Sequence, residues 1–275
     1  MIKNAVLLIS ALLTCHAKLT WASDVTEALS PEDMSNLASA EIVLLGERHD
    51  NADHHRAQTE LVELLSPTAV VFEMLTEQQA AEVTDENRLS EADLEKALGW
   101  NNSGWPDFSM YYPIFAAAPD AAIFGAQLER QASRAAMQDG VETVFGAQAE
   151  AFGLTQPLPK DQQEARERLQ AVAHCNKLPA DVLPRMVMVQ RLRDAHLARV
   201  TLQALADTGG PVVVITGNGH ARTDWGIPVN LHTANADVSV IALGQGEKNS
   251  PPVGEFDMTL TAPAPEREDP CAAFN

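Results

Sequence analysis

The sequence predicts an α/β fold: a Rossmann-like parallel sheet flanked by helices, with a helical insertion. Three observations support this prediction. Five short apolar runs are continuous rather than alternating, which is typical of parallel strands covered on both faces. A stretch with helical spacing separates the first two runs, and strand–helix–strand units imply right-handed crossovers between parallel strands. The segment between the third and fourth runs carries mostly helical patterns.

The apolar runs define the expected strands. They are EIVLLG (41–46), AVVFEM (69–74), AAIFGA (121–126), PVVVITG (211–217) and VSVIAL (238–243). Between the first two, Ala57, Leu61, Leu64 and Leu65 recur at the spacing of one helix face. Pro67 follows closely and marks the expected end of that helix.

Residues 131–208 are predicted to form the helical insertion, and residues 251–275 a C-terminal tail. The insertion includes the long amphipathic stretch PRMVMVQRLRDAHLARVTLQALAD, which requires a partner surface. The tail is rich in proline and acidic residues, and its FDMTL segment is expected to add an edge strand. A disulfide between Cys175 and Cys271 would attach the tail to the insertion. The entropy of loop closure would credit this bridge with roughly 4–5 kcal/mol at most.

The first 22 residues have the pattern of a secretory signal peptide. Lys3 gives a positive start, an apolar core follows, and TWA at 20–22 offers small residues to a signal peptidase. Residues 23–250 would then form the α/β domain of an exported, periplasmic protein. Cys15 raises the alternative of a lipid anchor, although Thr14 fits a lipobox poorly. Attachment to a membrane is expected only if this cysteine is lipidated.

The charge of the chain argues against nucleic acid as a partner. Cleavage of the signal peptide would change the formal net charge from −19 to −21, because it removes two lysines and no acidic residue. Phosphate binding needs basic patches, whereas a strongly acidic balance favours solubility.

Polar residues follow several of the predicted strands, where ligands bind in open α/β sheets. The first strand ends in GERH, with Glu47 and His49, and the fourth ends in GNGH, with His220. Glu73 ends the second strand and Arg130 follows the third. A carboxylate at the end of an apolar strand needs a partner, such as Arg130 or a ligand. The sequence therefore predicts a convergent polar site with two histidines and two carboxylates.

A second group of polar residues lies at the start of the first predicted helix. Asn51 or Asp53 can cap this helix, which leaves His54 and His55 in its first turn and Gln58 on the same face. The spacing is not the HExxH pattern of zinc proteases. At least one of the two histidines is expected to be solvated, and for either one a structural role and a ligand role stay open.

Aromatic residues are concentrated between positions 98 and 118. This segment holds two of the four tryptophans and both tyrosines, Tyr111 and Tyr112. Such a concentration is usually core, but it also suits a flat hydrophobic ligand. A tyrosine phenolate can bind haem iron, whereas the CxxCH motif for covalent haem attachment is absent from the sequence. Core packing and haem binding both stay open for the two tyrosines.

The motifs taken together resemble those of the ChaN-like haem-binding proteins, which belong to a superfamily with the Tiki, TraB and erythromycin esterase-like proteins. GERHDNADHHRAQ and TGNGHARTDWGIP are the most specific of them, and VVFEML, GWPDFSMYYPIFAAA, GAQLER and QRLRDAHLA fall between. The resemblance covers residues 40–245. It implies an α/β core with a helical insertion, and a haem-binding role in iron or haem handling.

Position by position, the resemblance implies a set of site residues: Glu47, His49, Gln58, Tyr111, Arg130 and His220. Two positions depart from the pattern of the family. Gln127 stands where an asparagine is usual, and Phe108 replaces a frequent tyrosine.

Two functional hypotheses follow. In the first, a tyrosine or a histidine binds haem iron, and Arg130 or a histidine pairs with the propionates. The exposed apolar site would favour a homodimer around the ligand. In the second, the chain is a metal-dependent hydrolase, in which His49, His220 and Glu73 hold a divalent metal and Glu47 acts as general base.

Overall fold

The computed structural model describes residues 25, 28–269 and 271–272. The expected signal peptide and the alternative of lipidation at Cys15 lie outside the described residues. Within them, no helix combines the length and the apolar character needed to cross a membrane.

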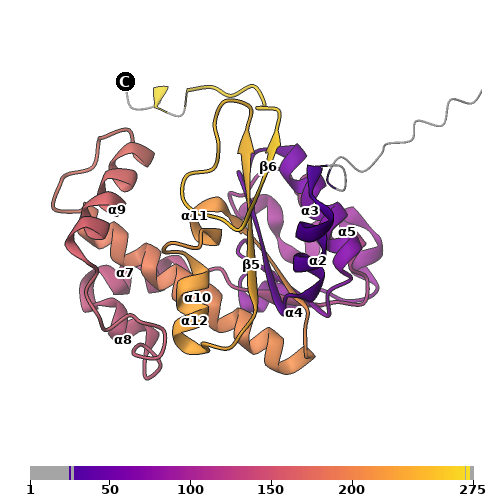
Figure 1. Cartoon of the computed structure of the whole chain (residues 1–275), viewed down its shortest axis with the longest axis horizontal. Coiled ribbons are helices and arrows are strands. Elements are labelled where there is room, and N and C mark those ends of the chain that lie inside the picture. Colours follow the sequence, from indigo (N-terminus) through magenta and orange to yellow (C-terminus); the bar gives the residue numbers. More distant parts are fainter. Residues whose placement is uncertain (1–24, 26–27, 270, 273–275) are drawn as a thin grey trace, which may run out of the picture.

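Six parallel strands form the central sheet, in the order β3-β2-β4-β1-β5-β6 (Figure 1). The strands are β1 (Ile42–Glu47), β2 (Ala69–Phe72), β3 (Ala122–Gly125), β4 (Val212–Gly217), β5 (Val240–Glu247) and β6 (Met258–Ala262). The first five lie on the five apolar runs, and β6 occupies the FDMTL segment at the edge of the sheet. The predicted α/β fold with a parallel sheet is therefore confirmed.

Helices cover both faces of the sheet (Figure 1). One face carries α2 (Pro31–Ser39), α3 (Ala52–Leu65), α5 (Glu91–Leu98) and α6 (Phe108–Ala117), together with two short 3₁₀ turns, and α4 (Glu77–Ala81) lies against β3. The other face carries α7 (Arg130–Asp139), α8 (Val141–Phe145), α9 (Lys160–Ala173), α10 (Leu183–Thr208), α11 (Asn218–Ala221) and α12 (Ile227–Ala234). The molecule thus has three layers.

The two faces of β1 show why the strand sequences are continuously apolar. Val43 and Leu45 pack in the core under α2, α3 and α6, whereas Ile42 and Leu44 pack in the core under α10 and α12. All four side chains are fully buried. Because successive side chains of a strand point to opposite faces, a strand covered on both sides needs an apolar residue at every position.

The segment between β3 and β4, which was expected to be a helical insertion, contains α7, α8, α9 and α10. The buried face of the 26-residue α10 packs on the sheet, so the sheet is the partner surface that its amphipathic pattern required. The predicted disulfide is confirmed: Cys175, just after α9, bonds to Cys271 in the tail, with 5.6 Å between the Cα atoms.

A short loop returns the chain from β5 to β6. Parallel strands need a crossover, and here the chain folds back directly across β5 instead of forming a helix. Two glycines make room for it. A Cβ at Gly244 would lie 2.7 Å from the ring of Phe256, and one at Gly246 would lie 2.7 Å from Pro252. The loop also brings Val253 to the carboxyl edge of the sheet, where it lines a cavity.

Candidate functional site at the carboxyl edge of the sheet

Glu47, the last residue of β1, is the centre of a buried hydrogen-bond network. Its carboxylate accepts hydrogen bonds from His49 Nδ1 at 2.7 Å and from the Tyr111 hydroxyl at 2.9 Å. His55 Nδ1 forms an ion pair with it at 3.2 Å, although the two groups are not aligned for a hydrogen bond. Burial alone would raise the pKa of Glu47, but the contacts with His49 and His55 lower it to about 2. The site therefore contains a permanently charged carboxylate.

His49 connects this network to a cavity. Its ring lies 4.8 Å from the ring of Trp105, and its Nε2 lies above Gly217, where a Cβ would come within 2.9 Å. The side chain is 32% exposed. Burial would lower the pKa of His49, but the hydrogen bond to Glu47 and the charge of Glu73 raise it to about 9. Gly217 is therefore required by the close approach of an imidazole.

Glu73, which follows β2, forms the second half of the site. Its Oε2 accepts hydrogen bonds from the Thr216 hydroxyl at 2.7 Å and from the Gly217 amide at 2.8 Å. Its Oε1 lies 3.5 Å from His220 Nε2. The expectation that Glu73 needs a partner holds, but the partner is not Arg130, because a backbone amide, a hydroxyl and a histidine already satisfy the carboxylate.

His220 lies between two carboxylates. Its Nδ1 donates to Asp194 at 2.5 Å, and its Nε2 faces Glu73. Burial would lower the pKa of His220, but the charges of Glu73 and Asp194 raise it above its ordinary value. The imidazolium is therefore held in a fixed orientation at the end of β4.

Both halves of the site meet in one cavity of about 740 Å³, which we call the main cavity. Glu47, His49, Glu73 and His220 all line it, so the structure brings together the two histidines and two carboxylates of the sequence prediction. Its remaining walls include Arg48, Trp105, Leu169, Gln190, Arg193, Arg222, Pro252, Val253 and Arg267. A cavity of this volume lies within the range that small molecules and cofactors occupy.

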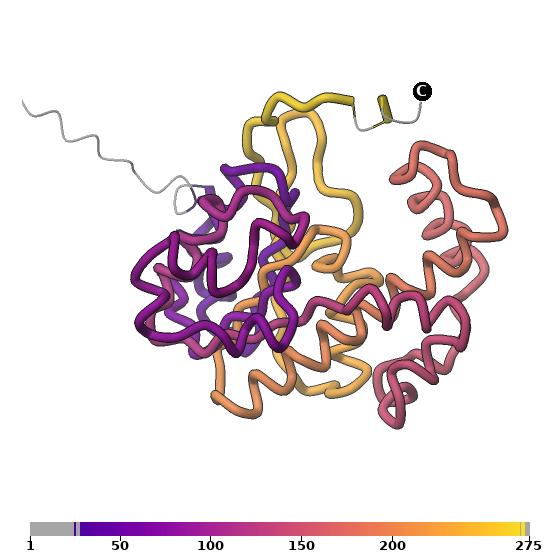
Figure 2. The backbone as a smooth tube through the Cα atoms, turned by 180° about the vertical axis from the view of Figure 1, so that it is seen from behind, coloured from indigo at the N-terminus to yellow at the C-terminus, as the bar shows by residue number. Residues whose placement is uncertain are grey.

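The tail forms the rim of the main cavity. Arg267 pairs with Asp50 and with Glu247, and Arg48 donates to Glu247 at 2.7 Å. We call these four residues the tail clasp. Figure 2 shows the tail running from β6 across the top of the molecule towards α9, to which Cys271 is bonded. Hydrogen bonds from Arg267 lower the pKa of Glu247 to about 2.

His54 and His55 are both buried, so the expectation that at least one of them is solvated is wrong. His54 Nδ1 accepts a hydrogen bond from the Arg48 amide at 2.9 Å, and its Nε2 donates to the Gly246 carbonyl at 3.1 Å. His55 Nε2 donates to the carbonyl of His49 at 2.9 Å. The two rings therefore fix the turn between β1 and α3.

Gln58 and the helix cap also support the backbone near the site. Of the two proposed caps, Asn51 is the N-cap of α3 and accepts a hydrogen bond from the Asp53 amide. Gln58 is fully buried and donates to the Leu45 carbonyl at 3.0 Å. It therefore lies against the middle of β1, beneath the residues that line the main cavity.

The tyrosines belong to the core. Tyr111 is fully buried, its ring lies 4.9 Å from that of Trp100, and its hydroxyl donates to Glu47. Burial and the neighbouring Glu47 raise its pKa above the ordinary value of a phenol. Tyr112 donates to the Arg88 carbonyl at 3.3 Å. The aromatic residue of this segment that reaches the main cavity is Trp105.

Arg130 lies apart from the main cavity. It is the exposed first residue of α7 and lines a separate hollow of about 370 Å³, which also reaches Glu73 and Trp105.

Asp194 is a site residue that the sequence analysis missed. It lies on the buried face of α10 with Leu197, Ala198 and Thr201, at the i+3, i+4 and i+7 positions of the apolar stripe. A carboxylate within such a stripe costs free energy unless it is paired, and this was the signal available in the sequence.

The described residues contain no group of three or more His, Cys, Asp or Glu side chains arranged to hold a metal ion. The reason lies in the pairing, because Nδ1 of each site histidine is engaged by a carboxylate and His220 Nε2 faces Glu73. The hydrolase hypothesis, with a divalent metal on His49, His220 and Glu73, gains no support from this geometry.

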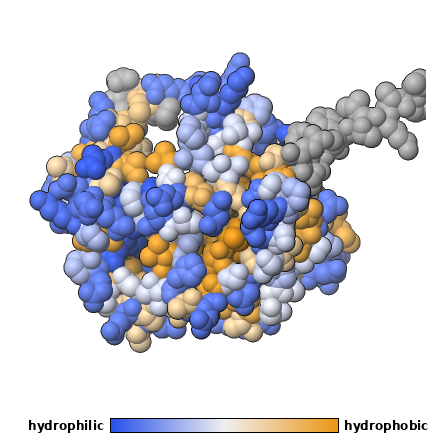
Figure 3. Space-filling model, viewed as in Figure 1, coloured by the Kyte–Doolittle hydropathy of each residue, from blue (hydrophilic) through white to orange (hydrophobic). Residues whose placement is uncertain are grey.

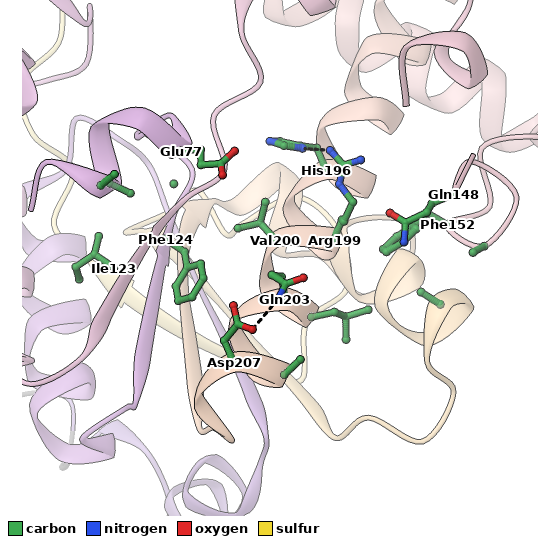
Figure 4. A pocket seen from close by; sticks show the side chains of 17 residues that line it. Glu77, Ile123, Phe124, Gln148, Phe152, His196, Arg199, Val200, Gln203 and Asp207 are labelled. Atoms are coloured by element: carbon green, nitrogen blue, oxygen red, sulfur yellow. Dashed lines mark hydrogen bonds between the residues drawn. The ribbon is translucent and has the colours of Figure 1, made fainter. Parts of the chain in front are cut away.

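A larger cavity of about 910 Å³ lies elsewhere, between α4, β3 and α10 (Figure 4). Polar side chains along its α10 wall pair with one another. Arg199 hydrogen-bonds to His196 at 3.0 Å, and Gln203 donates to Asp207 at 2.8 Å. Because these groups satisfy each other, we place the functional site at the main cavity instead.

The fold and this site define an α/β protein with a ligand cavity at the carboxyl edge of a parallel sheet. A family model described as "Haem-binding uptake, Tiki superfamily, ChaN" matches residues 34–231, which is well over half of the chain. The chain therefore belongs to this family.

Solved structures show the same fold. One is described as cofacial heme binding to ChaN of Campylobacter jejuni; it is 20% identical, has a TM-score of 0.60, and the match covers 79% of this chain and 86% of that one. An erythromycin esterase mutant in its open conformation is 16% identical, with a TM-score of 0.43 and coverage of 78% and 72%. The type III effector HopBA1 is 10% identical, with a TM-score of 0.44 and coverage of 78% and 80%. Among curated proteins, none matches this chain.

Proposed function

We propose that this protein binds haem in the main cavity and serves in iron or haem handling outside the cytoplasm. Membership of the ChaN family supports the ligand. The observation that carries the proposal is the environment of His49, whose ring reaches the cavity while a buried carboxylate holds its other nitrogen.

The residues present fit a haem. A histidine that binds a metal usually donates its second ring N–H to a carboxylate, which fixes the ring and increases its basicity. Glu47 does this for His49, so Nε2 would bind the iron. The iron is the chemistry that haem supplies when bound. Trp105 and Leu169 offer apolar surface for the porphyrin, while arginines of the cavity wall offer charge for the propionates.

We propose His49 as the iron ligand in preference to either tyrosine. Tyr111 has no exposed surface, and its hydroxyl proton is held by Glu47. Since its pKa is raised, loss of that proton to form a phenolate is disfavoured. Tyr112 lies in the same core and donates to a backbone carbonyl. Arg130, at the neighbouring hollow, is not needed as a partner for the propionates.

A hemin titration followed by absorption spectroscopy tests the proposal. We expect wild type to shift the Soret band with saturable binding, and His49→Ala to weaken that binding by at least tenfold. His232→Ala is the matched control, because His232 is exposed on α12. Tyr111→Phe should retain the spectrum of wild type. Absence of a Soret shift in wild type would overturn the function, whereas unchanged binding by His49→Ala would overturn only the choice of ligand.

Export and dimerisation are further parts of the proposal. Large apolar side chains are exposed near the mouth of the cavity, including Val172 at 66% and Val253 at 61%, and apolar surface gathers near α9 in Figure 3. Burying such surface against a second copy would shield the ligand. Size-exclusion chromatography with and without hemin tests the dimer, and cell fractionation tests the periplasmic location.

A further inference from the structure

A second, smaller chamber of about 330 Å³ lies beneath α9 and opens beside His220. We call it the side chamber. It shares Leu169, Gln190, Gly219, His220 and Arg222 with the lining of the main cavity, so the two spaces adjoin along this wall. A ligand in the main cavity can therefore extend a substituent into the side chamber.

Arg166 of α9 lines the side chamber and is only 9% exposed. Within the described part of the chain, its guanidinium makes one hydrogen bond, from Nη2 to the Trp225 carbonyl at 3.3 Å, and its Nε has no partner. A guanidinium carries five N–H donors, and a buried charge is costly unless it is paired. Burial lowers the pKa of Arg166 only to about 10, so the group stays charged at neutral pH.

The neighbouring charges are already engaged. Arg222, which stacks on Trp225 at 3.4 Å, is paired with Asp224. Asp194 is within electrostatic range of Arg166 but is hydrogen-bonded to His220. These pairs leave Arg166 as a cation that faces the chamber and lacks an ion-pair partner among the described residues.

A second polar group on the wall is also unpaired. Gln190 Oε1 is buried and has no hydrogen-bond partner among the described residues. The rest of the wall includes Leu169, Val172 and Val187, which are apolar. An occupant must therefore present a polar, anionic end to Arg166 and apolar surface to α9.

We propose that the side chamber binds a carboxylate carried by an apolar body, with Arg166 as its counter-charge. The inference rests on the proposed function in one respect, because a haem propionate is the source that the adjoining main cavity would supply. A separate small carboxylic acid is the other source of the same chemistry. The two sources are separable by experiment.

The test compares Arg166→Gln with wild type and with Arg185→Gln, a control at an exposed arginine on α10. The probes are hemin, its dimethyl ester, 1-pyrenebutyrate and the methyl ester of 1-pyrenebutyrate. A lost charge-assisted hydrogen bond corresponds to roughly a tenfold to hundredfold loss of affinity. We expect Arg166→Gln to lose that much for hemin and little for the dimethyl ester, and wild type to prefer hemin over its ester.

The outcomes separate the two proposals. If wild type binds hemin and its dimethyl ester equally well, and Arg166→Gln changes neither, the carboxylate site is overturned while haem binding stands. If wild type binds no hemin but binds 1-pyrenebutyrate, in preference to its methyl ester and through Arg166, the carboxylate site stands and haem binding falls. If neither acid binds, both are overturned. Should Arg166→Gln fail to fold, the comparison of acid and ester on wild type still decides.

Discussion

The two glycine-x-x-histidine turns, Gly46 to His49 and Gly217 to His220, have the same sequence pattern but different surroundings. In both, a buried carboxylate holds Nδ1 of the histidine. His49 leaves its other nitrogen at the main cavity and is 32% exposed, whereas His220 is 12% exposed and faces Glu73 with its other nitrogen. The pattern determines where an imidazole lies, while residues from other elements determine what it can do.

Replacing the carboxylate of the first turn should have the largest effect. Glu47→Gln leaves the buried His55 and the half-buried His49 without their counter-charge, so we expect a loss of about 3–5 kcal/mol in the free energy of unfolding. Urea denaturation measures it. Glu63→Gln, at an exposed position of α3, is the control and should lie within about 0.5 kcal/mol of wild type. A loss below about 1 kcal/mol would show that the network is not held by this charge.

The equivalent change in the second turn should cost less. Asp194→Asn removes one of two carboxylates from His220, and Glu73 remains to balance the charge. We expect a loss of about 1–3 kcal/mol by the same measurement. If this variant proved less stable than Glu47→Gln, the proposed difference between the two turns would be wrong.

The glycines of the second turn offer a matched pair. A Cβ at Gly217 would lie 2.9 Å from His49 Nε2, whereas a Cβ at Gly219 meets no heavy atom within 4 Å. Gly217→Ala should therefore displace the His49 ring and cost about 1–2 kcal/mol, while Gly219→Ala should be within about 0.5 kcal/mol of wild type. Thermal unfolding of both variants checks this; equal stabilities would mean that the two histidines are not packed across this residue.

The tail clasp should give the smallest effect. Because the folded pKa of Glu247 is about 2 and its ordinary value is 4.5, its stabilisation is complete above pH 4.5 and is lost as the pH falls towards 2. The partners Arg48 and Arg267 are partly solvent-exposed, so we expect about 1 kcal/mol. Urea denaturation at pH 5 and pH 3 measures the loss, and in Glu247→Gln the clasp's share of it should disappear. An identical pH dependence in the variant would rule out this role.

Much of the fold followed from local patterns, and part of the site followed from topology. The apolar runs located the first five strands because burial on both faces requires them to be continuous. His49 and His220 could be expected to meet, because the carboxyl ends of parallel strands lie on one edge of the sheet. These inferences needed only the sequence and general rules of chain geometry.

The partners of the site residues could not be predicted in the same way. Asp194 reaches His220 from a helix of the insertion, and Tyr111 reaches Glu47 from another layer. Such contacts depend on helix packing and rotation, which the local sequence does not fix. The burial of His54 likewise depends on the Gly246 carbonyl, 192 residues further along the chain.

The bridge between Cys175 and Cys271 closes a covalent ring that includes α10, β4 and β5. His220 lies inside that ring and His49 outside it. Reduction would release conformational freedom only in the enclosed part, because a cross-link restricts only the chain it encircles. The two imidazoles of one cavity thus answer to different chemistry, and a change in the redox state of the surroundings would loosen one half of the pocket before the other.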